Sequence, residues 1–294
     1  MPNELPKLLI TGVSGFLGSH FLSIFSEEWN LIGTFHQNAV RSNQVATYPL
    51  DLQNSSEVNL FLQKHQPQAI LHLAAMSNAN YCEQDPTTSF VVNVQSSLDM
   101  AQFCADEKIP FLFASTDLVF DGQQAPYSES DPTDPVNIYG KHKVIAEQNI
   151  LKTYPRAIIA RLPLMFGHSN SAPNFMTAWL SQLREGKIIK AFTDEYRTAA
   201  AAHEVIGGLL LLLRKKVSGI WHLGGAERMS RYDFALKMAN YYNLNPNLIE
   251  ASRQKEVKMA AGRPADVSLN SDKAFALGYQ VSKLEVALDK ITVS

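Results

Sequence analysis

Short runs of hydrophobic residues alternate with longer amphipathic stretches over the first 165 residues of the chain. Each run is bounded by Gly, Pro or polar residues, which is typical of strands buried inside a parallel sheet. The runs lie at 7–12, 30–35, 68–75, 110–116 and 156–163. The stretches between them predict helices at about 15–28, 54–65, 86–107 and 136–152. Strands and helices in alternation predict an α/β fold with a doubly wound parallel sheet.

This rhythm changes after Pro163. Helices are expected at 173–185, 203–215 and 229–242, and short strands at 188–192 and 218–223. No obvious linker separates the two halves of the sequence. We therefore expect one domain over residues 1–164 and a smaller C-terminal α/β lobe over 165–294, with a segment at about 192–216 packing back on the first domain.

Composition and charge narrow the class of protein. The 294 residues are 46% hydrophobic and 18% charged, which is ordinary for a globular protein, and the formal net charge is −2. The longest basic cluster is Arg214-Lys215-Lys216, so we expect no binding to nucleic acid. Cys82 and Cys104 are isolated, so buried free thiols are expected rather than a metal site.

The hydrophobic runs are too short for a membrane protein. The longest, at 205–213, has nine residues, whereas about 20 are needed to span a bilayer. The apolar run before Thr11 has three residues, which is too short for a secretory signal. We therefore expect a cytoplasmic protein.

A glycine-rich turn follows the first predicted strand. The stretch LLITGVSGFLGSHF sets its glycines between that strand and the next predicted helix. Positions without side chains let backbone N–H groups approach a pyrophosphate, and the order strand, glycines, helix, strand is the context that this function requires. The sequence thus predicts a Rossmann-type dinucleotide-binding domain. The cofactor-binding residues expected in this turn are Gly12, Ser14, Gly15, Phe16, Leu17 and Gly18.

The end of the second predicted strand bears on the choice of cofactor. An acidic residue about 20 positions after the glycines would select NAD by binding the ribose hydroxyls. The stretch from Trp29 to Leu50 contains no Asp or Glu, whereas His36 and Arg41 follow the strand. We therefore expect NADP(H) to be favoured over NAD(H), with the 2′-phosphate facing these two residues. The alternative is that both are simply exposed loop residues.

Further cofactor contacts are expected where later strands end. A third strand is expected between the runs at 30–35 and 68–75, and Asp51 and Leu52, which follow it, are placed to meet the adenine. Ala74 and Ala75 lie at the end of the fourth strand, the run at 68–75, where small side chains let the backbone approach the cofactor.

Polar residues are expected to converge at the carboxyl end of the fifth strand, the run at 110–116. Ser115 and Thr116 close that strand, and ligands of open α/β sheets bind at this edge. Tyr139 and Lys143 lie four residues apart at the start of a predicted helix, and therefore on one helical face. The Tyr–Lys spacing decides nothing by itself, but here the strand-end hydroxyls and the glycine turn point to the same place.

Five stretches follow one another in an order that is found in a known superfamily. They are TGVSGFLG, STDLVFDG, PYSESDPTDPVNIYGKHKVIAE, RLPLMFG and GRPADVSL. This set resembles the extended short-chain dehydrogenase/reductase superfamily and, within it, the dTDP-4-dehydrorhamnose reductase group. The resemblance covers nearly the whole chain and implies an NAD(P)-dependent oxidoreductase.

The resemblance implies catalytic roles for three residues. Tyr139 would protonate a carbonyl oxygen as hydride arrives from the nicotinamide, while Lys143 would tune Tyr139 and hold the nicotinamide ribose. Thr116 would orient the substrate oxygen, or Ser115 if the register differs by one residue. Pro163 would let the backbone beside it approach the nicotinamide. The cofactor contacts implied beyond the earlier ones are Asn93, Tyr139, Lys143 and Pro163.

The resemblance also implies a nucleotide-linked deoxysugar as the substrate. The substrate contacts that we expect are Ser115, Asn174, Phe175, Arg197 and Arg263. The guanidinium of Arg263 suits a pyrophosphate. The chain departs from the rhamnose reductases at 194–202, where it reads DEYRTAAAA in place of a Pro-Thr pair, so the sugar is not fixed by the resemblance.

Three residues beside the Tyr–Lys pair receive structural interpretations. Lys141 and His142 fall on other faces of the helix, and we expect solvated side chains. Asn137 is expected to shape the entry to the helix.

Three functions are weighed on this sequence. The first is the reduction by NADPH of a keto group on a nucleotide-linked deoxysugar, with Tyr139 as the proton donor. The second is an epimerase or dehydratase of the same superfamily, although the dehydratases use Thr-Asp-Glu where this chain has Thr116-Asp117-Leu118. The third is a non-catalytic NADP-binding regulatory subunit that resembles the β subunit of methionine adenosyltransferase. The superfamily resemblance is also compatible with a homodimer.

Overall fold

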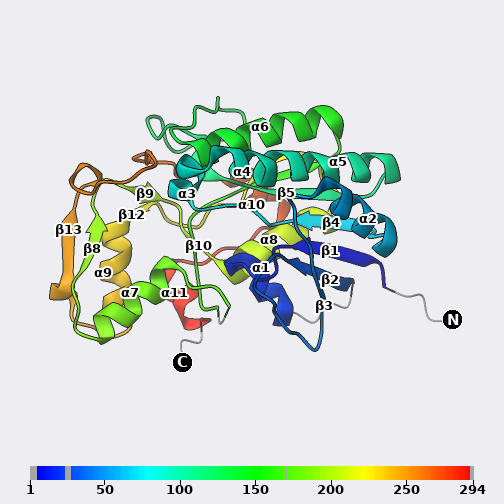
Figure 1. Ribbon diagram of the computed structural model, residues 1–294. Helices are drawn as coiled ribbons and strands as arrows, with labels where there is room; N and C mark the ends of the chain where they lie inside the picture. The colour runs from blue at the N-terminus through cyan, green and yellow to red at the C-terminus, as the bar shows by residue number, and fades with distance from the viewer. Residues whose placement is uncertain (1–4, 24–27, 170, 292–294) are drawn as a thin grey trace.

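A seven-stranded parallel sheet forms the centre of the fold (Figure 1). The structure is a computed structural model of the chain and describes residues 5–23, 28–169 and 171–291. From edge to edge the strands are β11 (Gly219–His222), β6 (Ile158–Leu162), β5 (Phe111–Thr116), β4 (Ala69–His72), β1 (Lys7–Thr11), β2 (Asn30–Phe35) and β3 (Ala46–Pro49). The strand order reverses between β1 and β4, which is where open α/β sheets bind their ligands. The predicted Rossmann-type fold is confirmed.

Helices cover both faces of this sheet. Those that share a hydrophobic core with one face are α2 (Ser55–His65), α5 (Ser96–Glu107) and α6 (Ile138–Thr153), and those on the other face are α1 (Phe16–His20) and α8 (Ala202–Arg214). Leu9 packs into the first core, whereas its neighbours Leu8 and Ile10 pack into the second, because successive side chains of a strand point to opposite faces. All three are fully buried. Burial on both faces explains why the strands read as continuous hydrophobic runs.

A separate hydrophobic core lies in the C-terminal half, at the left of Figure 1. It is built by α7 (Phe175–Arg184), α9 (Arg231–Tyr241), α11 (Leu284–Asp289), β8 (Ile189–Phe192) and β13 (Ile249–Ser252). Two short pairs accompany it, β7 (Met165–Phe166) with β10 (Ala200–Ala201) and β9 (Tyr196–Arg197) with β12 (Met229–Ser230). Ala200 packs into the core beneath the sheet and Ala201 into the C-terminal core, so the chain passes from one core to the other at β10.

The predicted helices are present, but two of them differ in form. The helix expected at 15–28 is α1 followed by a 3₁₀ turn at Phe21–Ser23, and residues 24–27 lie outside the described part of the chain. The helix expected at 86–107 consists of α4 (Pro86–Phe90), a π-helical segment at Val91–Gln95, and α5.

Several elements that the pattern did not predict have at most six residues, too few to show a hydrophobic period. They are β13 and the helices α3 (Ala79–Gln84), α10 (Asp272–Leu277) and α11, and the short 3₁₀ turns are Asp117–Val119, Pro246–Leu248 and Gln254–Glu256.

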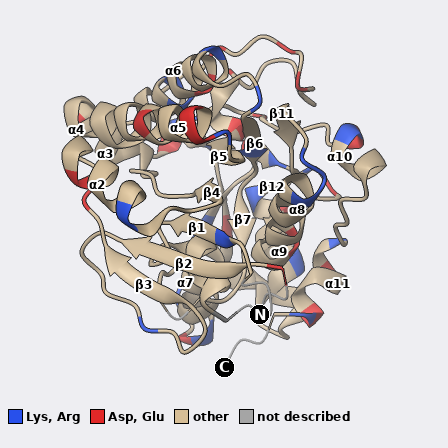
Figure 2. Ribbon diagram, turned by 90° about the vertical axis from the view of Figure 1, so that its right-hand side faces the viewer, with Lys and Arg blue, Asp and Glu red and all other residues tan. Residues whose placement is uncertain are grey.

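Charged residues of both signs are interspersed around the fold (Figure 2). This distribution agrees with the net charge of −2. Within the described residues, we find no helix with the length and apolar character needed to cross a bilayer. Cys82 and Cys104 are buried free thiols, as predicted.

Candidate active site

A cavity of about 670 Å³ lies at the carboxyl ends of β1, β2, β4, β5 and β6. Of the residues predicted for the site, those that line it are Gly12, Ser14, Gly15, Phe16, Leu17, Gly18, His36, Asp51, Leu52, Ala74, Ala75, Ser115, Thr116, Tyr139, Lys143, Pro163, Arg197 and Arg263. The predicted residues that are not part of the lining are Arg41, Asn93, Asn174 and Phe175. One hollow thus gathers side chains from both halves of the chain.

The glycine turn is pressed against the loop that follows β4. Gly12 has a φ of +75°, and a Cβ there would lie 2.8 Å from the Cα of Ala74. A Cβ on Gly18 would lie only 2.2 Å from the carbonyl oxygen of Gly12. The N–H groups of Gly12 and Val13 donate to the carbonyl oxygen of Thr34 at 2.8 and 2.9 Å, which ties the turn to β2. The result is a bare backbone surface of the kind that phosphates approach closely.

His36 and Arg41, predicted to meet the cofactor together, are placed differently. His36 follows the last residue of β2 and lines the cavity, and its Nε2 lies 3.7 Å from Oδ1 of Asp51. Arg41 is exposed on the loop that leads to β3 and does not line the cavity. The hydroxyl of Thr47 donates to the carbonyl oxygen of Val40 at 2.8 Å, which holds this loop beside β3. Arg41 is therefore an exposed loop residue, which is the alternative given for it in the sequence analysis.

Asn93 lies behind the cavity wall, contrary to the expectation of a cofactor contact. Its side chain is fully buried in the π-helical segment. Its Oδ1 accepts from the N–H of Met76 at 2.9 Å, and its Nδ2 donates to the carbonyl oxygen of Met76 and to the hydroxyl of Ser89, both at 3.1 Å. Met76 belongs to the loop after β4 that lines the cavity. Asn93 thus fixes the shape of that loop.

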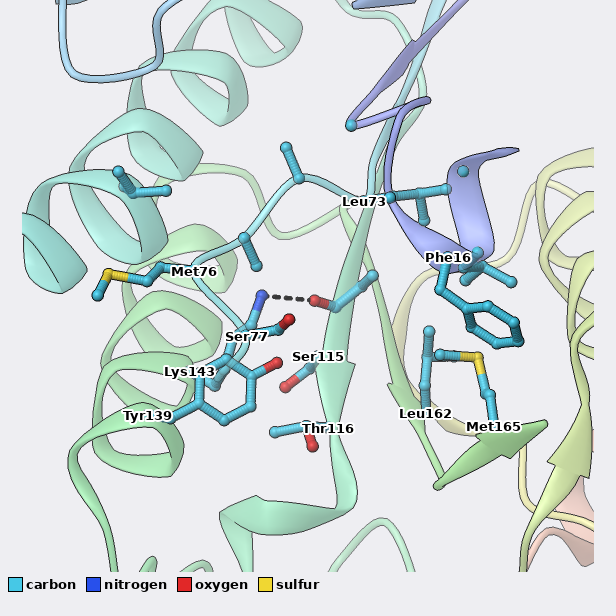
Figure 3. A pocket seen from close by; sticks show the side chains of 18 of the residues that line it. Phe16, Leu73, Met76, Ser77, Ser115, Thr116, Tyr139, Lys143, Leu162 and Met165 are labelled. Carbon is cyan, nitrogen blue, oxygen red and sulfur yellow. Dashed lines mark hydrogen bonds between the residues drawn. The ribbon is translucent and has the colours of Figure 1, made fainter. Parts of the chain in front are cut away.

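Tyr139 and Lys143 project from the first turns of α6 into the cavity (Figure 3). Asn137 is the N-cap of this helix, as expected, because its Oδ1 accepts from the N–H of Gly140 at 2.8 Å. Figure 3 shows Tyr139 and Lys143 facing Ser115 and Thr116 at the end of β5. The helix and the strand together bring the four predicted polar groups to one place.

Burial controls the protonation of the Tyr–Lys pair. Lys143 is 2% exposed, its ammonium donates to the carbonyl oxygen of Ala114 at 2.8 Å, and it lies 4.2 Å from the centre of the Phe113 ring. Burial lowers the pKa of Lys143 to about 7, while the carboxylate of Glu147 acts in the opposite direction. Burial also raises the pKa of Tyr139, and the negative charge of Asp117 adds to this effect. The phenol therefore keeps its proton at neutral pH.

The two strand-end hydroxyls have different partners. The hydroxyl of Ser115 donates to the carboxylate of Glu147. Thr116 donates to Oδ1 of Asp117 at 3.1 Å, and its oxygen accepts from the N–H of Leu118 at 3.2 Å. Burial raises the pKa of Asp117 to about 6. Because Ser115 is held by Glu147, the geometry favours Thr116 as the hydroxyl next to Tyr139.

A cluster of charged side chains forms the far end of the cavity. Arg197 lies with its Nε 3.8 Å from Oδ2 of Asp117 and its Nη2 3.5 Å from Oε1 of Glu195. Its guanidinium also donates to the carbonyl oxygens of Tyr196 at 2.6 Å and Pro264 at 3.2 Å. The lining residues of this end are Asp117, Glu195, Arg197, Arg231 and Arg263. Two carboxylates and three guanidinium groups give the cluster a net positive formal charge.

Two predicted substrate contacts belong to the framework of α7. Asn174 is its N-cap, accepting from the N–H of Met176 at 2.9 Å and donating from Nδ2 to the carbonyl oxygen of Gly167 at 2.7 Å. The ring of Phe175 lies 3.9 Å beneath the guanidinium of Arg231. Neither side chain lines the cavity, because capping and ring stacking engage both. Arg231, which stacks on Phe175, does line the cavity.

The expectation of a solvated His142 is wrong. The ring is 7% exposed and its Nδ1 lies 2.8 Å from the hydroxyl of Ser89, because α6 also packs against α4. Lys141 is exposed, as expected.

Sequence reasoning did not single out Asp117, Glu195, Arg231 or Glu147 as functional residues. Their segments are distant in sequence, and only the spacing of Glu147, four residues after Lys143, is visible without the fold. Across the described ranges, no group of three or more His, Cys, Asp or Glu side chains is arranged to hold a metal ion.

Comparison with known proteins places this geometry in a family. The family model for the RmlD substrate binding domain matches residues 6–292. A probable low-salt glycan biosynthesis reductase, Agl14, of Haloferax volcanii is 28% identical over 260 residues, which are 87% of this chain and 86% of that protein. Methionine adenosyltransferase 2 subunit beta of Xenopus laevis is 28% identical over 280 residues, which are 92% of this chain and 82% of that protein.

Solved structures agree with this assignment of the fold. A dTDP-4-dehydrorhamnose reductase from Bacillus anthracis in complex with NADP superposes with a TM-score of 0.87 over 98% of both chains, at 22% identity. A hypothetical dTDP-4-dehydrorhamnose reductase from Sulfolobus tokodaii superposes with a TM-score of 0.86 at 28% identity, over 98% of this chain and 100% of the other. The predicted class, an NAD(P)-dependent oxidoreductase of the short-chain dehydrogenase/reductase type, is confirmed at the level of the family. The chain belongs to the RmlD substrate binding domain family of the extended short-chain dehydrogenases/reductases.

Proposed function

We propose that this protein is an NADPH-dependent reductase of a keto group on a nucleotide-linked deoxysugar. The observation that carries the proposal is the position of Tyr139. This buried phenol, which keeps its proton at neutral pH, lines one cavity with Lys143, Thr116, the glycine turn and a cluster of arginines. A proton donor thus shares the cavity with a surface suited to a dinucleotide and with side chains suited to the phosphates of a substrate.

The residues present fit a dinucleotide at the glycine turn. The positions of Gly12 and Gly18 have no room for a Cβ, so the turn offers backbone to a pyrophosphate. Ala74, Ala75 and Pro163 would then border the nicotinamide half of the cofactor. The bound cofactor would supply the hydride that reduces the carbonyl carbon.

Tyr139 would supply the proton in the same step. Its hydroxyl donates the proton to the carbonyl oxygen, so that the product leaves as an alcohol and the phenol becomes a phenolate. The ammonium of Lys143 stabilises this negative charge in a site from which water is largely excluded. Thr116 would hold the carbonyl oxygen beside the phenol. Solvent then returns the proton to Tyr139.

The preference for NADPH rests on His36 and on the absence of an acidic residue at the end of β2. The B. anthracis reductase was solved in complex with NADP. His36→Ala should weaken NADPH binding by about tenfold, the value of one hydrogen bond to a charged group, and should leave NADH binding nearly unchanged. Arg41→Ala is the matched control, because Arg41 does not line the cavity. Fluorescence titration with each cofactor measures the effect.

The substrate class rests on the far end of the cavity. Arg231 and Arg263 would bind the phosphates of a sugar nucleotide, and Arg197, held between two carboxylates, would face the sugar. Residues 165–294, with 192–216 packed back on the first domain, would act mainly as the substrate lobe. Leu118 lines the cavity at the position where a dehydratase would need a Glu to act as the catalytic base. Reduction is therefore favoured over dehydration.

The direct experiment offers dTDP-4-dehydrorhamnose and NADPH to the purified protein. The reductase proposal predicts that each NADPH oxidised reduces one keto group to a hydroxyl, which is measured as loss of NADPH absorbance and formation of one equivalent of the reduced nucleotide sugar. A protein that binds both compounds without turnover would contradict it.

A second candidate is a cofactor-binding regulatory subunit. It is favoured by the likeness to the β subunit of methionine adenosyltransferase over 92% of this chain. Co-purification with a methionine adenosyltransferase catalytic subunit, combined with no turnover of keto-sugar nucleotides, would support this candidate over the first.

A further inference from the structure

Beneath the cavity, polar side chains form a row across three neighbouring strands. Ser115 on β5 is in register with Arg161 on β6, and Arg161 is in register with His222 on β11. Residues in register on parallel strands point to the same face of a sheet. Glu147 from α6 completes the row, since its carboxylate accepts from the hydroxyl of Ser115 and from Arg161.

Arg161 is a buried cation with two partners. Its Nη2 donates to Oε2 of Glu147 at 2.8 Å, and its Nη1 lies 3.3 Å from Nε2 of His222. The side chains of Arg161 and Glu147 are each 3% exposed. Burial lowers the pKa of His222 to about 3, so this ring is neutral and brings no charge to the row.

Lys143, which lines the cavity, lies on the same helix as Glu147. It lies one turn before Glu147 on α6, so both side chains emerge on one helical face. They contact successive residues of β5, Lys143 through the carbonyl oxygen of Ala114 and Glu147 through the hydroxyl of Ser115. Glu147 is therefore ion-paired with Arg161 on the strand, and its negative charge also raises the pKa of Lys143 on its own helix.

The other titratable groups around Lys143 carry no charge at neutral pH. His72 on β4 is fully buried, and burial lowers its pKa to about 3. Burial raises the pKa of the Cys82 thiol on α3, and burial also raises that of Tyr139 on α6. Among the described residues that act on the Lys143 pKa, Glu147 thus supplies the negative charge.

We propose that Glu147 is a positioning residue that keeps Lys143 in its ammonium form and holds it beside Tyr139. The effect of Glu147 on catalysis rests on the proposed reductase function. The charge arrangement itself stands on the Arg161–Glu147 ion pair and on the position of Lys143 one turn before Glu147 on α6.

The physical reason lies in the different proton affinities of the two cations. With Glu147 neutralised, two cations would be buried at this end of β5 without the counter-charge of Glu147. Arg161 is a permanent cation, because a guanidinium stays protonated in proteins. Lys143, which burial already brings to a pKa of about 7, would therefore become the neutral amine. Loss of Arg161 has the opposite effect, because Glu147 would then act on Lys143 alone.

The test measures the pH midpoint at which Lys143 loses its proton, by NMR of protein labelled with ¹³C at the lysine side chains. The Lys143 signal is identified by its absence in Lys143→Arg. In Glu147→Gln the midpoint should fall by one pH unit or more, which is a tenfold change in the protonation equilibrium. In Arg161→Gln the midpoint should rise. Glu204→Gln is the matched control, because it neutralises a buried carboxylate of α8 outside the cavity, and it should leave the midpoint in place.

A midpoint that does not move in folded Glu147→Gln would overturn the proposal. If that variant fails to fold, Arg161→Gln decides, since a midpoint that stays or falls there contradicts a shared carboxylate. The kinetic consequence is a basic limb of the kcat profile that moves to lower pH in Glu147→Gln with the affinity for NADPH retained. Because the NMR titration needs no substrate, a failure of the reductase proposal would be recognised separately by the absence of turnover in the wild type.

Discussion

The glycine turn gives the most direct structural prediction, because the position of Gly18 has no space for the methyl group of an alanine. In Gly18→Ala the new Cβ would lie 2.2 Å from the carbonyl oxygen of Gly12 and 2.8 Å from the Cα of Val13. Real contacts of this kind do not come closer than 3.0 Å, so the backbone must move by at least 0.8 Å. Overpacking of this size costs about 1–3 kcal/mol of folding free energy.

The same displacement should disturb cofactor binding. The backbone that must move is the surface proposed to hold the pyrophosphate, so the affinity for NADPH should fall by at least tenfold. Gly207→Ala is the matched control, since Gly207 is exposed in α8 and its Cβ would meet nothing within 4 Å. That variant should be more stable by about 0.5–1 kcal/mol, as expected for Ala in place of Gly inside a helix. Urea denaturation and NADPH fluorescence titration measure both variants, and NADPH affinity within twofold of wild type in Gly18→Ala would refute the reasoning.

Two further predictions concern residues around the cavity. Asp117 has a folded pKa of about 6 against about 3.9 when unfolded, so the folded state binds more protons between these values and stability falls as pH rises from about 4 to 6. Asp117→Asn removes this loss. Urea denaturation should show the stability of the variant relative to wild type rising by about 2–3 kcal/mol from pH 4 to 7. A stability difference between the two proteins that does not change with pH would contradict the raised pKa of Asp117. Asn93→Ala leaves both backbone groups of Met76 without their side-chain partner and should cost about 1–3 kcal/mol in the same assay, with weaker NADPH binding. If Asn93→Ala binds NADPH as wild type does, the shape of the loop after β4 is not set by Asn93.

The sequence was most informative where a hydrophobic period or a local motif extends over many residues. The buried strands, the long helices and the glycine turn were all visible, because each rests on local contacts or on burial of a whole face. The convergence of Tyr139 and Lys143 with Thr116 also follows from the position of a strand end and the pitch of a helix.

The far end of the cavity was less accessible to sequence reasoning. Asp117, Glu195 and Arg231 are brought together by a turn after β5, a loop after β8 and the first residue of α9, and their spacing in sequence carries no period. Asn174 and Phe175 were misplaced because an N-cap and a ring under a guanidinium are set by tertiary contacts. The expectation for His142 failed for a related reason. The helix α6 packs both on the sheet and against α4, so fewer of its faces are solvated.

The central claim is that Tyr139 gives its proton to a keto-sugar nucleotide while NADPH is oxidised. The measurement that tests it most directly is single-turnover NADPH oxidation with dTDP-4-dehydrorhamnose in wild type, Tyr139→Phe and Tyr81→Phe, where Tyr81 is an exposed tyrosine outside the cavity. We expect turnover in wild type and in Tyr81→Phe, and a loss of about 10²–10⁴-fold in Tyr139→Phe that persists at saturating NADPH. Equal rates in the folded Tyr139→Phe and wild-type proteins would contradict the account.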